Sequence, residues 1–206
     1  MNISEIIKAT GVLTSEHSYR KFQKRVDANK SLITETIKDL DVDILEFLEQ
    51  HSIINGSVLD IGTGSGIHSV HLAKRGFQFT GIDYSPTAIE IALRLSEESG
   101  TKIDFLVDDI HQTKLVSQFD IALDRGCLTF TTKPYIEQYK NVIDRLVKIN
   151  GYYILKIDQL QSLENNYASF LNDPSYDLIT KKEAFLTFYS KEHKIPAIFM
   201  VFRKLH

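Results

Sequence analysis

The chain has 206 residues, of which 43% are hydrophobic and 25% are charged, as in ordinary globular domains that bury a sizeable core. A net charge of −3 without any basic run disfavours nucleic acid as a partner. A single cysteine, Cys127, excludes an internal disulfide and a cysteine-rich metal site, and no apolar run reaches a membrane-spanning length, so we expect a cytoplasmic protein.

The first fifty residues are predicted to form a helical extension of the same domain. Residues 18–40 have the pattern of one helix, and Asp43-x-x-Glu46 has the form of an N-terminal cap ahead of another. Tyr19 and Phe22 could cover a substrate as an aromatic lid, or they could pack against the core. We therefore expect residues 1–50 to form an extension or lid and residues 51–206 to form the main domain.

The segment Ser57–His71 runs from an apolar strand through an acidic residue into a glycine-rich turn and then a helix. Gly62, Gly64 and Gly66 permit a sharp turn and the close approach of a ligand to the backbone. The spacing is G-x-G-x-G, with Asp60 two residues before the first glycine, whereas dinucleotide sites have G-x-G-x-x-G. The pattern therefore favours a cofactor other than a dinucleotide.

A second predicted strand, Phe79–Asp83, also ends in an acid and is followed by a helix that Ser85 and Pro86 open. At the carboxyl end of such a strand, an acid can accept hydrogen bonds from both hydroxyls of a ribose. Asp83 could instead cap the next helix, although Ser85 suits that position better. The two strand-acid-helix units together predict a nucleoside pocket.

Strands and helices alternate from residue 57 onward. Strands are expected near 57–61, 78–82, 103–107, 119–124 and 151–157, and helices near 65–75, 85–98, 133–149 and 159–171. This alternation predicts a mainly parallel sheet with helices on both faces. The last two apolar runs, 184–190 and 195–202, are too close in sequence for a crossover helix, so they should pair as antiparallel neighbours.

Five segments, taken in chain order, resemble those of the class I S-adenosylmethionine-dependent methyltransferases. They are the glycine motif Asp60–Gly66, the ribose-binding acid of Gly81–Asp83, the third strand Ile103–Ile110, the fourth strand Phe119–Asp124 and the fifth strand Gly151–Lys156. The resemblance covers roughly residues 50–206. It implies a Rossmann-like, doubly wound α/β sheet of seven strands, mainly parallel, with an antiparallel strand in the C-terminal hairpin.

The resemblance also implies S-adenosylmethionine as the cofactor and S-adenosylhomocysteine as its product. The residues that it assigns to the cofactor are Asp60, Gly62, Thr63, Gly64, Gly66, Asp83, Tyr84, Asp109 and Ile110. Of the two acids after the third strand, the strand pattern places Asp109 rather than Asp108 at the adenine edge, although either could face solvent. Tyr84 could contact the adenosine or occupy an exposed turn.

The segment Asp124–Phe130 should lie beside the transferable methyl group, because ligands of open α/β sheets bind outside the carboxyl ends of the strands. Asp124 could orient the attacking atom or accept its proton, and Arg125 could hold an anionic substrate. Alternatively, both could pair with structural charges. The run Asp-Arg-Gly resembles the thiopurine and tellurite-resistance branch of small-molecule methyltransferases.

Several nearby residues are expected to be structural. Cys127 is predicted to be a small buried residue, because direct methyl transfer needs no covalent enzyme intermediate. His68 and His71 share a helix face, but the sequence offers no third metal ligand, so we expect surface or helix-packing roles and no metal site. Lys156 could line the substrate side, but a structural or solvated position is favoured.

The function that these patterns predict is in-line transfer of a methyl group to an N, O or S atom of a small molecule. Catalysis would consist mainly of holding donor and acceptor together in a reactive geometry. A non-catalytic module that binds an adenosyl ligand is an alternative. A nicotinamide-dependent oxidoreductase is disfavoured by the glycine spacing and by the terminal hairpin.

Overall fold

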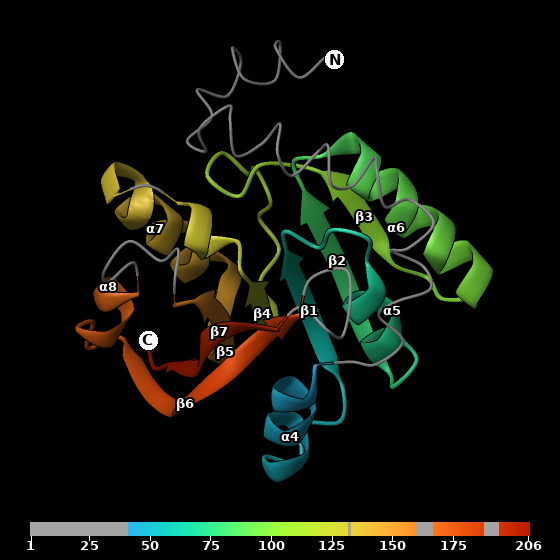
Figure 1. Cartoon of the computed structure of the whole chain (residues 1–206). Coiled ribbons are helices and arrows are strands. Elements are labelled where there is room, and N and C mark those ends of the chain that lie inside the picture. The colour runs from blue at the N-terminus through green and yellow to red at the C-terminus, as the bar shows by residue number, and fades with distance from the viewer. Residues whose placement is uncertain (1–40, 132, 160–166, 188–193) are drawn as a thin grey trace.

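The computed structural model describes residues 41–131, 133–159, 167–187 and 194–206. Seven strands form one sheet in the order β3-β2-β1-β4-β5-β7-β6 (Figure 1). Their bounds are β1 Gly56–Ile61, β2 Phe77–Asp83, β3 Asp104–Val107, β4 Phe119–Arg125, β5 Val147–Asp158, β6 Tyr176–Thr187 and β7 Lys194–Lys204. Strands β1 to β5 are parallel, and β7 lies antiparallel between β5 and β6. The predicted fold class and the antiparallel pairing are confirmed.

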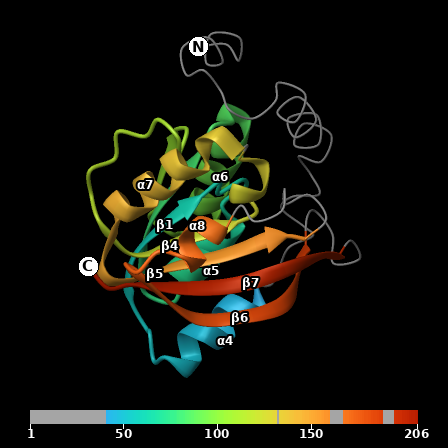
Figure 2. The same ribbon diagram turned by 90° about the vertical axis from the view of Figure 1, so that its left-hand side faces the viewer.

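Helices cover both faces of this sheet (Figures 1 and 2). Their bounds are α4 Val42–Gln50, α5 Ile67–Ala73, α6 Pro86–Ser99, α7 Ile136–Leu146 and α8 Ala168–Leu171, with short 3-10 turns at Leu128–Phe130 and Lys133–Tyr135. Side chains of α4, α5 and α6 share one buried apolar cluster with one face of the strands, and α7 and α8 share a second cluster with the other face. Consecutive residues of a strand point to opposite faces, so Val58 joins the first cluster and Leu59 joins the second.

β1 and β4 are parallel neighbours at the centre of the sheet. From β1 the chain adds strands toward one edge of the sheet, and from β4 it adds them toward the other edge. Connections leave these two strands toward opposite sides, and a crevice opens at their carboxyl ends. The glycine turn after β1 and the segment after β4 both lie at this end. The topology thus selects one place where a ligand can meet residues from both segments.

Two strands begin earlier in the sequence than predicted. β5 begins at Val147, because α7 ends at Leu146 and the fully buried Val147 already pairs with Phe119. β6 begins at Tyr176, eight residues before the expected position of 184, and most of its side chains before residue 184 are partly or fully exposed. Such an outer strand is fixed by its pairing with β7 along its whole length, and it lacks the apolar signal of a buried strand.

Helix boundaries also differ in part from the predictions. The cap of α4 is Asp41, whose side chain accepts a hydrogen bond from the Asp43 N–H, and the predicted cap at Asp43 was wrong. Ser85 caps α6, with Pro86 in the first helical position, as predicted. The predicted helix at 18–40 and most of the one at 159–171 lie outside the described residues. No helix in the described ranges is long and apolar enough to cross a membrane.

Candidate active site

The glycine turn between β1 and α5 is closely packed on one side and open on the other. A Cβ atom on Gly66 would lie 2.7 Å from the Phe105 ring and 2.9 Å from Ala92, so only glycine fits there. Gly64 has a φ of +56°, and a Cβ atom built on it has no neighbour within 4 Å. Gly64 therefore faces open space, where a ligand could approach its backbone. A Cβ on Gly62 would lie 3.3 Å from Cys127, which places the turn directly beside the segment after β4.

Asp60 and Thr63 hold this turn in shape. The buried Asp60 Oδ2 accepts hydrogen bonds from Thr63 Oγ1 at 2.7 Å and from Ser69 Oγ at 2.5 Å. Burial raises the pKa of the Asp60 carboxyl above its ordinary value, and the two hydroxyl donors oppose that shift. The contacts described for Asp60 and Thr63 therefore lie inside the protein and hold the turn, and the predicted binding of the cofactor by these two residues stays a prediction.

Asp83 lies at the carboxyl end of β2, next to the open side of the turn. Its Oδ2 accepts the Gly64 N–H at 3.0 Å, and its Oδ1 accepts the Ser85 N–H at 2.8 Å. Burial raises the pKa of Asp83 to about 6, although both backbone donors favour the ionised form. Each carboxylate oxygen has two lone-pair directions, so each keeps one free for a further donor. Tyr84 follows Asp83 in the chain and is partly exposed.

The segment after β3 contains Asp109 and Ile110, the residues predicted for adenine. Asp109 Oδ1 accepts the His111 N–H and also contacts His111 Nδ1, both at 3.0 Å. His111 Nε2 lies 3.2 Å from Thr131 Oγ1, so this histidine joins the segment after β3 to the segment after β4. Ile110 is buried in the apolar cluster beside α7. The predicted adenine contacts stay a prediction.

Asp124 is completely enclosed and faces α7. Its carboxylate accepts the Cys127 N–H at 2.7 Å, the Leu128 N–H at 3.1 Å and two phenolic hydroxyls, Tyr139 at 2.6 Å and Tyr153 at 3.1 Å. Burial raises its pKa to about 6 against the effect of these donors. Such a carboxylate anchors the start of the segment after β4. Its predicted role as a proton acceptor is not tested by this geometry, which fits the structural alternative more directly.

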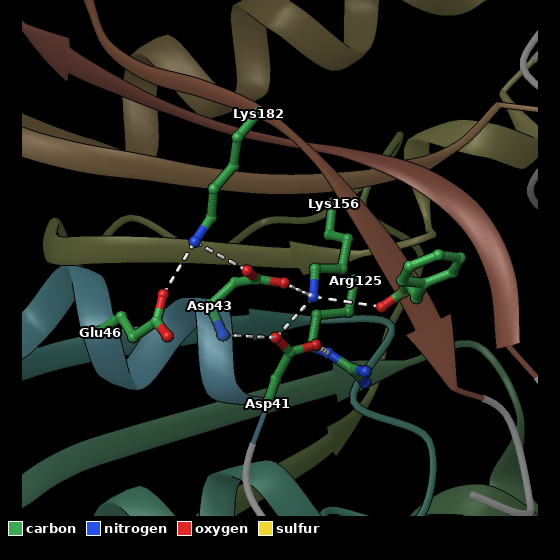
Figure 3. Close-up of polar contacts among 7 residues, drawn as sticks. Asp41, Asp43, Glu46, Arg125, Lys156 and Lys182 are labelled. Atoms are coloured by element: carbon green, nitrogen blue, oxygen red, sulfur yellow. Dashed lines mark hydrogen bonds and ion pairs between the residues drawn. The ribbon is translucent and has the colours of Figure 1, made fainter.

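Arg125 points to the opposite face from Asp124 and enters a buried ion-pair cluster (Figure 3). Its Nε donates to Asp41 Oδ2 at 3.0 Å, and Lys156 Nζ contacts Asp41 Oδ1 and Asp43 Oδ2, each at 2.5 Å. Arg125 and Lys156 are paired neighbours on β4 and β5. Burial opposes ionisation of Asp41, but the two cations outweigh it and hold the pKa of Asp41 below its ordinary value. Lys156 is thus a buried structural cation, as the sequence favoured.

The cluster continues outward to the surface. Lys182 of β6 contacts both Asp43 and Glu46 at 2.9 Å. In this cluster, acids at the start of α4 form ion pairs with cations from β4, β5 and β6. These ion pairs connect the first turns of the helix to the sheet. Surface pairs such as Lys182 with Glu46 contribute little to stability, about 0–1 kcal/mol, whereas the enclosed pairs of Asp41 are far more sensitive to the loss of one partner.

His68 is buried, with 7% of its surface exposed. Of the two roles expected for it, a surface role is thus wrong, whereas a role in helix packing agrees with the burial. Neither ring nitrogen has a hydrogen-bond partner among the described residues. Burial, followed by the charge of Arg125, holds its pKa well below the ordinary value, so the ring is neutral near pH 7. Cys127 is only partly buried, which differs from the predicted buried position, but desolvation still raises the pKa of its thiol well above the ordinary value. The described residues contain no group of three potential ligands that could hold a metal.

Sequence reasoning missed four residues that shape this region: Asp41, His111, Tyr139 and Tyr153. Asp41 and Lys156 are 115 residues apart in the chain, and Asp124 and Tyr153 are 29 apart. No local pattern encodes such contacts. The one available signal was the apolar face of the helix at 133–149, since a tyrosine on a buried helix face needs a partner for its hydroxyl.

The sequence is similar to methyltransferases in the comparisons with known proteins. Residues 58–151 match a family model described as a methyltransferase domain. EEF1A lysine methyltransferase 2 of Homo sapiens is 35% identical over 122 residues, which cover 54% of this chain and 52% of that protein. The ubiquinone biosynthesis O-methyltransferase of Chromobacterium violaceum is 34% identical over 112 residues, covering 52% and 47%. The chain thus spans about half the length of these curated relatives.

Solved structures share the fold at lower identity. TehB from Haemophilus influenzae superposes with a TM-score of 0.68 at 17% identity, covering 81% of this chain and 63% of that one. The 1,6-didemethyltoxoflavin-N1-methyltransferase of Burkholderia thailandensis gives a TM-score of 0.69 at 18% identity, covering 95% and 92%. These matches show that residues 58–151 form a methyltransferase domain and that the chain has the fold of the solved structures, with the same order of strands in one sheet.

Proposed function

We propose that this protein transfers a methyl group from S-adenosylmethionine to an N, O or S atom of a small molecule. The observation that carries the proposal is the position of Asp83. Its carboxylate lies at the end of β2, holds the Gly64 N–H at 3.0 Å and keeps a free lone pair on each oxygen beside the open face of the turn. Two neighbouring ribose hydroxyls would complete this set of donors.

The residues present fit the proposed cofactor. Asp83 would accept the ribose hydroxyls, and the open backbone at Gly64 leaves room for the ligand beside them. Asp109 and Ile110 would lie toward the adenine, with Tyr84 beside the adenosine, while Asp60, Thr63, Gly62 and Gly66 hold the turn. When bound, S-adenosylmethionine supplies an activated sulfonium methyl group. The contribution of the protein is then to hold the acceptor in line and to exclude water, which can lower a barrier by about 7–11 kcal/mol.

The segment after β4 would supply the acceptor side. Asp124 holds its first residues through two backbone N–H groups, and Gly62 packs against Cys127 in the same segment. Cofactor turn and acceptor segment are therefore in direct contact, and a shift of one moves the other. A protein proton acceptor is needed only where the attacking atom carries a proton at neutral pH.

A second candidate acceptor is a lysine side chain of a protein. The observation that favours it is the similarity to EEF1A lysine methyltransferase 2, which is 35% identical over about half of each chain. A relative of comparable identity is named for O-methylation in ubiquinone biosynthesis. Sequence similarity at this level therefore supports methyl transfer more strongly than it supports either acceptor.

Cofactor binding is tested first, by calorimetry with S-adenosylhomocysteine. We expect about one site per chain, because the chain carries one set of motifs. Replacing Asp83 with alanine should weaken binding by about 10- to 100-fold, since two hydrogen bonds to a charged group are lost. Unchanged affinity in a folded Asp83→Ala variant would remove Asp83 from the cofactor site.

Turnover and acceptor class are tested together with S-adenosylmethionine that carries an isotopically labelled methyl group. The protein is incubated separately with a metabolite extract and with a protein extract, with Asp83→Ala as the matched control. The proposal expects label in a metabolite, detected by mass spectrometry. Label on protein lysine would favour the second candidate. Cofactor binding without label in either extract would indicate a binding module and contradict the proposal.

A further inference from the structure

At the carboxyl end of the parallel strands, on the α4–α5 side of the sheet, two side chains carry buried polar atoms that have no hydrogen-bond partner among the described residues. They are Arg125, whose Nη2 makes no hydrogen bond to the described residues, and His68, whose two ring nitrogens make none. The hydrogen bond from Arg125 to Asp41 is donated by Nε, so it does not use Nη2. An unpaired buried polar group destabilises the folded state, and folded proteins rarely keep one without a reason. Here the unpaired atoms belong to residues on two different elements.

Both residues lie at the carboxyl edge of the sheet, where the topology opens its crevice. Arg125 is the last residue of β4, and His68 lies two residues after Gly66, in the helix that follows the glycine turn. Ile61 of β1 pairs with Asp124 of β4, so Arg125 follows directly beside the start of the glycine turn that leads into the helix of His68. In agreement, the charge of Arg125 is among the causes that lower the pKa of His68. Gly62 of the turn contacts Cys127, two residues after Arg125, which brings the same two segments together independently.

The chemistry of the free atoms defines what they can bind. A guanidinium nitrogen only donates hydrogen bonds, and a neutral imidazole offers one donor and one acceptor. Their partner must therefore accept hydrogen bonds, and the fixed positive charge of Arg125 favours an anion. A carboxylate suits this arrangement, because arginine binds carboxylates through well-oriented, charge-assisted hydrogen bonds. An ammonium group is excluded from contact with Arg125 by its own charge.

We propose that Arg125 and His68 bind an anionic group, of the carboxylate type, on the methyl acceptor. The inference rests on the proposed function and narrows its substrate class from any small molecule to one with a negatively charged group near the atom that is methylated. Arg125 would bind the anion through Nη2 while Asp41 holds Nε, so that the ion pair fixes the direction of the guanidinium (Figure 3). His68 would add a neutral donor from the opposite segment.

The test uses the full chain saturated with S-adenosylhomocysteine and two probe anions, benzoate and malonate. Their neutral counterparts benzamide and malonamide have nearly the same shape. We expect each anion to raise the thermal unfolding temperature and each amide to leave it unchanged. His68→Phe keeps a ring of similar size, and Arg125→Lys keeps a charge that can still contact Asp41. Each variant should weaken the anion response at least about tenfold.

Arg94→Gln is the matched control, because Arg94 is an exposed arginine on α6 whose ion pair, within the described part of the chain, is with Glu90. It should leave the anion response unchanged. His68→Phe should also leave the unfolding temperature of the ligand-free protein unchanged or raised, since no hydrogen bond is lost. If Arg125→Lys fails to fold, His68→Phe alone decides the outcome.

Three results would overturn the inference. The first is an absent anion response, or an equal one in all variants, while S-adenosylhomocysteine still binds. The second is competition between the anions and S-adenosylhomocysteine, or weaker binding of S-adenosylhomocysteine by both variants, which would assign the two residues to the carboxylate of the cofactor. The third is a marked loss of stability in ligand-free His68→Phe, which would show an internal partner. Failure of S-adenosylhomocysteine to bind the wild type would instead reject the proposed function.

Discussion

The buried acids of this protein differ in what surrounds them, and their pKa values follow. The donors that Asp83 and Asp124 receive from the described residues are all neutral, and burial raises the pKa of each acid to about 6. Asp41 is enclosed as well, but Arg125 and Lys156 lower its pKa below the ordinary value. At neutral pH, ionisation of Asp83 and Asp124 therefore destabilises the folded state. Ionisation of Asp41 stabilises it, because the two cations lie beside the carboxylate.

The pH dependence of stability should reveal Asp83 directly. Its pKa is about 6 in the folded protein and 3.8 when unfolded, so the folded state binds the extra proton between these values, and ionisation destabilises the fold as pH rises. Asp83→Asn removes this ionisation. The stability of the variant relative to wild type should therefore increase by up to about 3 kcal/mol from pH 4 to pH 7, measured by urea unfolding without ligand. A difference that does not change with pH would contradict the raised pKa.

Asp124→Asn separates the two roles considered for that residue. The Asp124 carboxylate accepts four hydrogen bonds, and the NH₂ group of an asparagine would face some of these donors. If Asp124 holds the segment after β4, we expect Asp124→Asn to lose about 2–3 kcal/mol of stability together with reduced turnover. S-adenosylhomocysteine affinity should stay within a few-fold. Wild-type stability combined with a turnover lower by ~10²-fold or more would instead support a proton-accepting role.

Helix α4 is connected to the sheet in two ways. Its apolar side chains Ile44, Phe47 and Leu48 lie in the cluster shared with α5 and α6. Its cap, Asp41, binds the last residue of β4 and its neighbour on β5. Apolar burial gives the helix its affinity for the sheet, and the ion pairs fix where its first turn lies.

The cap can be tested against a matched surface acid. Asp41→Asn retains a good capping side chain, so the helix start itself should be preserved. The substitution leaves two enclosed cations without their shared partner, and we expect a loss of about 3 kcal/mol or more in urea unfolding. Glu46→Gln on the same helix breaks only the exposed pair with Lys182 and should change stability by less than about 1 kcal/mol. Equal effects of the two substitutions would show that the cluster contributes no more than a surface pair.

Across the whole molecule, sequence patterns predicted the features that are determined by residues close together in the chain. The glycine turn, Asp83 and the Ser85-Pro86 helix start are encoded within a few residues, and the predicted sheet of seven strands is confirmed. The start of β6 was not predictable, because pairing with β7 rather than its own apolar residues makes it a strand. The contacts of Asp41 and the enclosure of Asp124 depend on residues brought together only by the complete fold.

The lid prediction concerns residues outside the described ranges and is testable by truncation. Among the described residues, both apolar clusters begin at or after Ile44, so removal of residues 1–38 keeps all of these described side chains. If the removed segment covers the acceptor, S-adenosylhomocysteine should bind within a few-fold of wild type while methyl transfer is abolished. Calorimetry and labelled transfer measure the two quantities. Equal loss of both in a folded product would assign the segment to cofactor binding.

The position of Asp41 also limits how short a stably folded version of the described sheet and helices can be made. A polypeptide that starts at Val42 would keep the described side chains of both apolar clusters, yet Arg125 would have lost the carboxylate that orients it. One that starts at Asp41 itself would place a new terminal ammonium group beside that carboxylate, in competition with Arg125 and Lys156. A polar residue outside both described apolar clusters thus sets a limit to truncation, and engineered fusions at this end need a few residues of spacer before it.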